Sequence, residues 1–307
     1  MSVDYSSTAL IANVKRRCST PTSQSLFANT DFCALMSDEM KDILVPLIMS
    51  AKEDYFLTYK DYSIDGSTTT FAIPDRAIGQ KVRNIDFYDA TAVSFYEPTR
   101  TDLNALGTPI QWTDVGGYYI QDNDVIFTTA PTDTSKYVRM YYFRRPNNII
   151  KTTLCGQITA INTGTKVVTL DNAPTTWTTS TTFDFIKGRG GFQSLGDDKV
   201  ITAVSGFDLT FSATLPTGLA VGDWVAEAGE SPIPQIPYEG HNCIAQLAAV
   251  KVLEALSDAN MIKQADAKAQ AMLAKFLSVI KDRVDGQTKK IVSRRGIFTH
   301  LRANKGW

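Results

Sequence analysis

The sequence predicts an α+β protein in which a helical bundle, built from the two ends of the chain, carries a large β insertion and a C-terminal arm. Two observations predict this class. Apolar residues recur every three or four positions over 31–57 and again over about 238–285, whereas the residues between alternate as strands do. Because helices so far apart in sequence can bury their apolar faces only against each other, we expect one shared helical core.

The composition is that of a folded protein, and the sequence lacks the patterns of membrane and secreted proteins. The chain has 307 residues, with 43% hydrophobic and 21% charged residues, which is typical of a folded protein with more than one domain. No apolar run approaches the about 20 residues that cross a bilayer. The basic residues near the N-terminus follow the short apolar stretch, which is the wrong order for a secretory signal. We therefore expect a cytoplasmic product without membrane contact.

The N-terminal region, 1–58, is predicted to be helical. Residues 8–17 fit a short helix, and a longer helix covers 31–57. Pro46 lies inside the longer pattern, which resumes in phase after it. Since proline lacks an N–H and clashes with the carbonyl four residues earlier, we expect a kink near 42–46 and continuation beyond it.

Residues 59–150 are predicted to form a β-rich domain, because the period changes to two from Thr58 onward. The runs YKDYSID and TTTFAIP flank Gly66 and Ser67, which predicts a hairpin. Later alternating runs end in turn residues, among them Asp122 and Asn123.

Residues 151–235 are predicted to form an inserted unit, either a small β-barrel or a sandwich. Its strands are short and evenly spaced, and INTGTKVVTL places a Thr-Gly turn between two alternating runs. The proline-rich run SPIPQIP then ends the β region. Residues 236–286 return to helical periodicity, with a turn or a new cap at Ser257–Asn260.

No residue pattern predicts a catalytic, cofactor or metal site, so we expect a protein that is not an enzyme and has no cofactor. The cysteines form no CxxC pair and no zinc spacing with histidine, and we expect buried, reduced thiols at Cys18, Cys33, Cys155 and Cys243. His241 and His300, the only histidines, belong to no catalytic set with serine or cysteine. We expect His241 to have a neutral capping or packing role.

Two further sequence fragments are more typical of turns than of binding sites. Asp122 and Asp124 flank an asparagine, but the rest of a calcium loop is missing. Lys187–Gly191 is basic and glycine-rich, but it lacks the spacing of a nucleotide loop and no long helix follows it.

The C-terminal segment 287–307 differs from these fragments because its charge is distinctive. Residues 281–307 hold eight basic and two acidic side chains, a net charge of +6, so the rest of the chain carries −7. Apolar residues are interspersed among these cations. We expect a docking arm whose apolar residues fill pockets while its cations meet an acidic surface or nucleic acid; a disordered basic tail is the alternative. The proposed docking residues are Lys289, Lys290, Ile291, Arg294, Arg295, Ile297, Phe298, Leu301, Arg302 and Trp307.

Three segments carry a family resemblance: VKRRCSTPTSQSLFANTDFCALMSDEMKDILVPLIMSAKEDYFLTYKDY, VRMYYFRRPN and VGDWVAEAGESPIPQIPYEGHNCIAQLAAVKVLEAL. Together they resemble the head–tail connector (adaptor) proteins of tailed bacteriophages. The resemblance implies a virion protein that assembles as a ring, commonly of twelve copies, beneath the portal. It also implies an arm docking on the portal protein, a downstream tail protein as partner, and a lumen through which double-stranded DNA passes without sequence-specific binding. The segment 287–307 matches that arm in position and character, whereas the unit at 151–230 is larger than the family core requires.

Two other functions stay open. The chain is alternatively a tail-tube or tail-completion protein without a portal contact. The third reading is a glycan-binding or hydrolytic virion protein that uses the Thr-rich β units, with Trp112, Trp177 and Trp224 as the available platforms.

Overall fold

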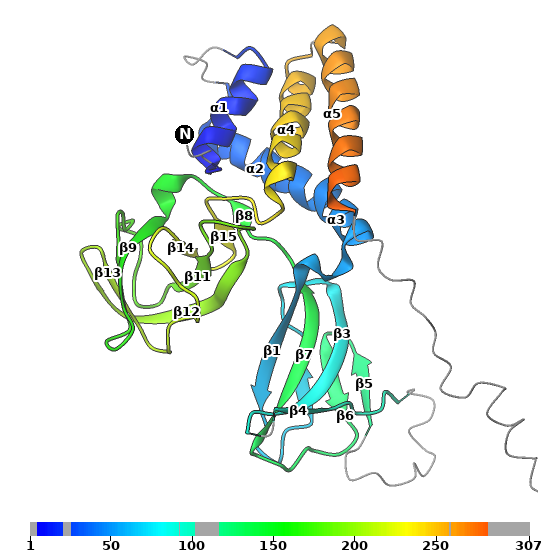
Figure 1. Cartoon of the computed structure of the whole chain (residues 1–307), viewed down its shortest axis with the longest axis vertical. Coiled ribbons are helices and arrows are strands. Elements are labelled where there is room, and N and C mark those ends of the chain that lie inside the picture. The colour runs from blue at the N-terminus through cyan, green and yellow to red at the C-terminus, as the bar shows by residue number, and fades with distance from the viewer. Residues whose placement is uncertain (1–4, 21–25, 92, 102–116, 258, 282–307) are drawn as a thin grey trace, which may run out of the picture.

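The structure of the chain, a computed structural model, describes residues 5–20, 26–91, 93–101, 117–257 and 259–281 (Figure 1). The chain mixes helices and strands, as predicted. Helices come from both ends of the sequence, and a sheet domain and a barrel lie between them in chain order.

The helices of the two ends share one hydrophobic core. They are α1 (Ser7–Arg17), α2 (Asn29–Glu39), a π-helical turn (Met40–Leu44), α3 (Val45–Ala51), α4 (His241–Ala255) and α5 (Ala259–Ile280). Phe32, Met36 and Ile48 are fully buried in the same cluster as Ile244 and Ala248. Helix α4 is apolar on nearly all sides because it contacts α1, α2 and α5 together.

The longer N-terminal helix continues through Pro46, as expected. Pro46 cannot donate the N–H that an α-helix would need there, and the preceding turn widens: the N–H of Val45 donates to the carbonyl of Met40, five residues back. The predicted end of this helix at 57 is wrong, because Lys52 leaves the helical conformation and a 3₁₀ turn (Glu53–Phe56) leads into the first strand. At the other end of the chain, Ser257 adopts a positive φ of 58° in the turn between α4 and α5.

The sheet domain packs two antiparallel sheets over one core. The four-stranded sheet has the order β1-β7-β3-β4 and the three-stranded sheet the order β2-β6-β5. Their bounds are β1 (Leu57–Ser63), β2 (Thr70–Ala72), β3 (Ala77–Asp89), β4 (Ser94–Tyr96), β5 (Tyr118–Gln121), β6 (Asp124–Phe127) and β7 (Lys136–Arg144). Ile85 and Met140 of the larger sheet share a buried cluster with Phe71 and Val125 of the smaller.

The predicted hairpin around Gly66 is wrong, whereas the turn at Asp122 and Asn123 does join a hairpin, β5–β6. Strand β1 pairs with β7, and β2 pairs with β6 in the other sheet. The residues around Gly66 do form a turn, in which the carboxylate of Asp65 accepts hydrogen bonds from the backbone N–H groups of Ser67 and Thr68. After this turn the chain crosses to the second sheet, because β1 and β2 belong to different sheets over one shared core.

Of the two alternatives for the inserted unit, the structure has the barrel. Its six strands close in the order β10-β13-β12-β11-β14-β9. They are β9 (Gly156–Asn162), β10 (Val167–Leu170), β11 (Thr182–Ile186), β12 (Ser194–Ser205), β13 (Asp208–Phe211) and β14 (Trp224–Glu227). Phe183, Phe185 and Leu209 fill the interior.

A two-stranded stem joins the barrel to the rest of the protein. The chain enters the barrel after β8 (Asn148–Ile149) and leaves it before β15 (Glu230–Ser231), and these two strands pair in parallel. The N–H of Ile149 donates to the hydroxyl of Ser37 on α2, at 2.8 Å, which anchors the stem to the helices. None of the described helices combines the length and apolar character needed to span a membrane.

Candidate functional site

The predicted docking arm lies outside the described residues. Every proposed docking residue falls within 287–307, and the description ends at Lys281. His300 and Trp112 also lie outside it. The arm therefore stays a prediction.

The two fragments with weak site patterns both form turns. Asp122 has a positive φ of 52° where β5 turns into β6. In the glycine-rich fragment, the N–H of Lys187 donates to the carbonyl of Gln193, and the strand β12 follows. A Cβ on Gly188 would lie 2.1 Å from the carbonyl oxygen of Gly222, so this glycine allows two loops to approach closely.

His241 is the first residue of α4 and is buried against the rings of Tyr5 and Phe192, whose centroids lie 5.4 and 5.1 Å away. Burial lowers the pKa of His241 to about 4, although the nearby carbonyls of Ile236 and Pro234 favour the protonated form. The residue is therefore neutral near pH 7. It packs where Tyr5 of the N-terminal segment and Phe192 of the barrel meet the start of α4.

The four cysteines are free and buried. Burial raises the pKa of Cys18, Cys33 and Cys243 to about 11, which disfavours the reactive thiolate. Within the part of the chain that the structure describes, no cluster of three or more His, Cys, Asp or Glu side chains is arranged to hold a metal ion.

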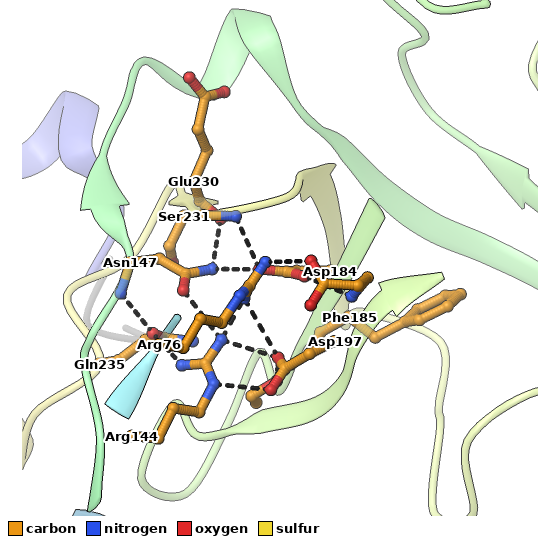
Figure 2. A network of polar contacts seen from close by, with 12 residues as sticks. Arg76, Arg144, Asn147, Asp184, Phe185, Asp197, Glu230, Ser231 and Gln235 are labelled. Carbon is orange, nitrogen blue, oxygen red and sulfur yellow. Dashed lines mark hydrogen bonds and ion pairs between the residues drawn. The ribbon is translucent and has the colours of Figure 1, made fainter. Parts of the chain in front are cut away.

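A network of polar contacts joins the sheet domain, the barrel and the proline-rich connector (Figure 2). We call it the polar junction, formed by Arg76, Arg144, Asn147, Asp184, Asp197, Asp198 and Gln235. Arg76 precedes β3 and Arg144 ends β7, whereas the carboxylates project from β11 and β12. A groove of about 860 Å³, lined by residues of β1 and of the start of β12, opens beside it.

Arg144 binds three partners with one guanidinium group. Its Nε and Nη2 donate to the two carboxylate oxygens of Asp197, at 2.8 and 2.7 Å. Nη2 also donates to Oδ1 of Asn147 at 2.8 Å, and Nη1 donates to Oε1 of Gln235 at 3.0 Å. Such a bidentate pair fixes orientation as well as distance.

Asp184 is fully buried, at 0% exposure, and its carboxylate is surrounded by donors. It accepts hydrogen bonds from Arg76 Nη1 at 2.5 Å and from Asn147 Nδ2 at 2.7 Å. The backbone N–H groups of Asp198 and Gly229 donate to it at 3.0 and 2.9 Å. This carboxylate therefore has its acceptor capacity filled.

The charges of the junction support one another. Burial alone would raise the pKa of Asp197, but Arg144, a hydrogen bond from Ser194 and Arg76 outweigh it and hold the pKa below its usual value. For Arg76, burial opposes the charge, and the hydrogen bond and charge of Asp184 outweigh this and raise the pKa. Both residues stay ionised over the physiological range.

The junction is suited to holding two β units rigidly together. Its carboxylates are engaged by guanidinium, backbone and side-chain donors, among them the hydroxyl of Ser194. Its contacts tie strands of two β units to each other and to the connector, so it holds the barrel and the sheet domain in one relative orientation.

Sequence reasoning missed the junction. Asp184 occurs inside the apolar run FDFI, and a carboxylate in a strand buried on both faces requires a cationic partner. That signal identifies Asp184 as unusual, but its partner Arg76 is 108 residues away in sequence.

Comparison with known proteins adds no assignment. The chain matches no protein-family model and no curated protein.

Proposed function

We propose that the protein is a structural virion protein, an adaptor that forms a ring between the portal and the tail of a tailed bacteriophage. Residues 287–307 are its portal-docking arm, a downstream tail protein binds the opposite side of the ring, and double-stranded DNA passes through the lumen. The family that the sequence resembles commonly assembles with twelve copies, and we propose the same number here. In this proposal the chain performs no catalysis.

The observation that carries this proposal is the modular arrangement of the chain. Helices from both ends close one core, and two β units are attached to that core by short connections. A subunit in a closed ring needs two different faces for its neighbours and further faces for the partners above and below. Separate modules supply such faces without changing the helical core.

The polar junction supports the same reading. A connector between two large assemblies must present its surfaces in a fixed geometry. Arg144 and Asp184 each bind partners from different modules through several hydrogen bonds, which opposes independent motion of the barrel.

The charge distribution is also consistent with a DNA conduit. The chain outside 281–307 carries a net charge of −7. A lumen of the same sign as the phosphates lets DNA slide without being held, because binding would require Lys or Arg to displace the counterions of the DNA.

The test is mass photometry of the protein mixed with assembled portal rings of the same virus. We expect full-length protein to add the mass of twelve copies to each portal ring, and a variant ending at residue 286 to add none. A second variant separates the two kinds of contact in the arm: glutamine at Lys289, Lys290, Arg294 and Arg295 removes charge and keeps the apolar residues.

A complex that forms equally well without the arm would contradict the docking role of 287–307. If full-length protein fails to bind a properly assembled portal, the runner-up applies, in which the chain is a tail-tube or tail-completion protein that binds another ring.

A further inference from the structure

The four-stranded sheet has a solvent-facing side that we call the outer face. Along β7, Val138, Met140 and Tyr142 point into the core of the sheet domain, so the residues between them point outward. The strand register places three cross-strand rows on this face. They are Tyr59–Tyr141–Asn84, then Asp61–Arg139–Asp86, then Tyr137–Tyr88–Phe95.

Aromatic rings on this face are exposed to an unusual degree. Tyr59 and Phe95 are each 52% exposed and Tyr137 is 37% exposed. The rings of Tyr59 and Tyr141 contact each other, as do those of Tyr88 and Phe95, with centroids 6.0 and 5.1 Å apart. Preassembled tyrosine and arginine side chains on a solvent-facing surface are typical of binding hot spots.

The face already binds a guanidinium group. Arg139 lies with its guanidinium carbon 3.9 Å from the ring centroid of Tyr59 and 3.8 Å from that of Tyr88. Its Nε and Nη2 donate to the two carboxylate oxygens of Asp61, at 2.6 and 2.7 Å. Aromatic stacking combined with a carboxylate is the chemistry that recognises arginine.

The outer face retains negative charge after this pair is formed. Asp86 lies beside Arg139 in the central row, where both side chains are largely covered, at 9 and 8% exposure, whereas the exposed Glu97 follows directly after β4. Neither forms an ion pair with any residue that the structure describes, and Asp86 accepts a hydrogen bond from the side chain of Asn84. Burial first, and the charge of Glu97 second, raise the pKa of Asp86. At the helical end of the sheet, Arg83 is paired with Asp54. A cationic partner would therefore be attracted to the exposed carboxylate of Glu97, beside the central row.

The chain supplies such a partner close by. Helix α5 ends beside α3 (Figure 1). Its last residue, Ile280, packs against the helical core, and so does Phe143, the β7 residue at the helical end of the outer face. From Phe143 to Tyr137 the strand extends about 20 Å, and a chain of the length of 282–307 spans up to about 85 Å when extended. The segment 287–307 carries six of the basic residues and the apolar residues Ile297 and Phe298.

We propose that in the free subunit the basic arm, residues 287–307, docks on the outer face of its own sheet. The arginines and lysines of the arm meet the exposed carboxylate of Glu97, and its apolar side chains cover the exposed rings. Because the arm is tethered, its effective concentration at the face is in the millimolar range, so even a weak contact is populated.

This contact has a consequence for assembly. An arm that occupies the outer face is not free for another partner, so a partner of the arm must displace it. The docked arm therefore keeps the free subunit from premature association. This contact forms within the isolated subunit, so it does not depend on whether the arm also binds a portal.

The test is hydrogen exchange of the full-length protein, read by mass spectrometry over 287–307. The face variant combines Phe95→Ala with Glu97→Gln. The matched control combines Phe207→Ala, at a barrel position that is 56% exposed, with Asp266→Asn on the exposed side of α5. All four positions are solvent-exposed, and thermal unfolding verifies that both variants keep the fold.

We expect amide exchange over 287–307 to be about tenfold faster in the face variant than in the wild-type protein and in the control, which corresponds to about 1.4 kcal/mol. Salt at about 1 M, where the Debye length is about 3 Å, should accelerate exchange in the wild-type protein. Equal exchange in all three proteins would overturn the proposal, and so would protection that survives in the face variant. Protection that disappears on dilution would also overturn it, because the arm of a second copy would then occupy the face.

Discussion

Substitution of Asp184 by asparagine tests whether the polar junction holds the β units together. Asparagine keeps the shape of the side chain, but it removes the charge that faces Arg76 and turns one terminal atom into a donor. That donor would then face groups that are donors themselves: Arg76, Asn147 and two backbone N–H groups. Removing one partner of a buried ion pair costs about 3–5 kcal/mol, and we expect a loss of that size in the free energy of unfolding.

The matched control is Asp198→Asn. Asp198 contacts the same guanidinium, at 2.6 Å, but its side chain is 59% exposed. An exposed pair contributes at most about 1 kcal/mol, so this variant should lose no more than that.

Both variants are measured by equilibrium unfolding in urea, followed by tryptophan fluorescence, because Trp177 is buried in the barrel. If Asp184→Asn loses less than about 1 kcal/mol, or if the two variants lose the same amount, burial does not determine the strength of the junction and the reasoning fails.

Three further results are expected. Since the pKa of His241 is about 4 in the folded protein and 6.5 when unfolded, the unfolded chain binds the proton between these values. Stability should therefore fall by about 3 kcal/mol as pH decreases from 6.5 to 4, and His241→Leu should remove this part of the slope in urea titrations at several pH values. Cys18, Cys33 and Cys243 should react with Ellman's reagent slowly at pH 8 until the protein unfolds, and rapid reaction of the native protein would contradict their burial. Gly188→Ala should lower the unfolding free energy by about 1–3 kcal/mol, because its Cβ meets a backbone carbonyl that cannot move aside; an unchanged denaturation midpoint would refute this.

The helical core could be predicted from the sequence because its signal is local. Phe32, Met36 and Met40 recur at helical spacing, and all three are fully buried. The effect of Pro46 could also be predicted, because its missing N–H changes the hydrogen bonds of the helical turn around it.

The strand partners could not be predicted in the same way. Gly66 and Ser67 correctly indicate a turn, but a turn does not say which strand follows as the partner. Strand β1 pairs with β7, whose residues come more than 70 positions later, and only the shared core of the two sheets decides this. The period-two alternation of KYVRMYYFR was visible, but which of its two sides faces solvent depends on the second sheet.

The polar junction and the outer face could not be predicted from the sequence, for the same reason. Each joins side chains that are distant in sequence, such as Arg139 with Asp61 and Arg144 with Gln235, and each becomes a site only when the strands are paired. The sequence can indicate that a charged residue in an apolar strand needs a partner, but it does not identify that partner.

The central claim, that this chain is a ring-forming portal adaptor, is tested most directly by electron microscopy of the full-length protein mixed with assembled portal rings of its virus. The account predicts a second ring coaxial with the portal, present with the full chain and absent when residues 287–307 are removed. Portal rings that remain bare in the presence of excess full-length protein would contradict it.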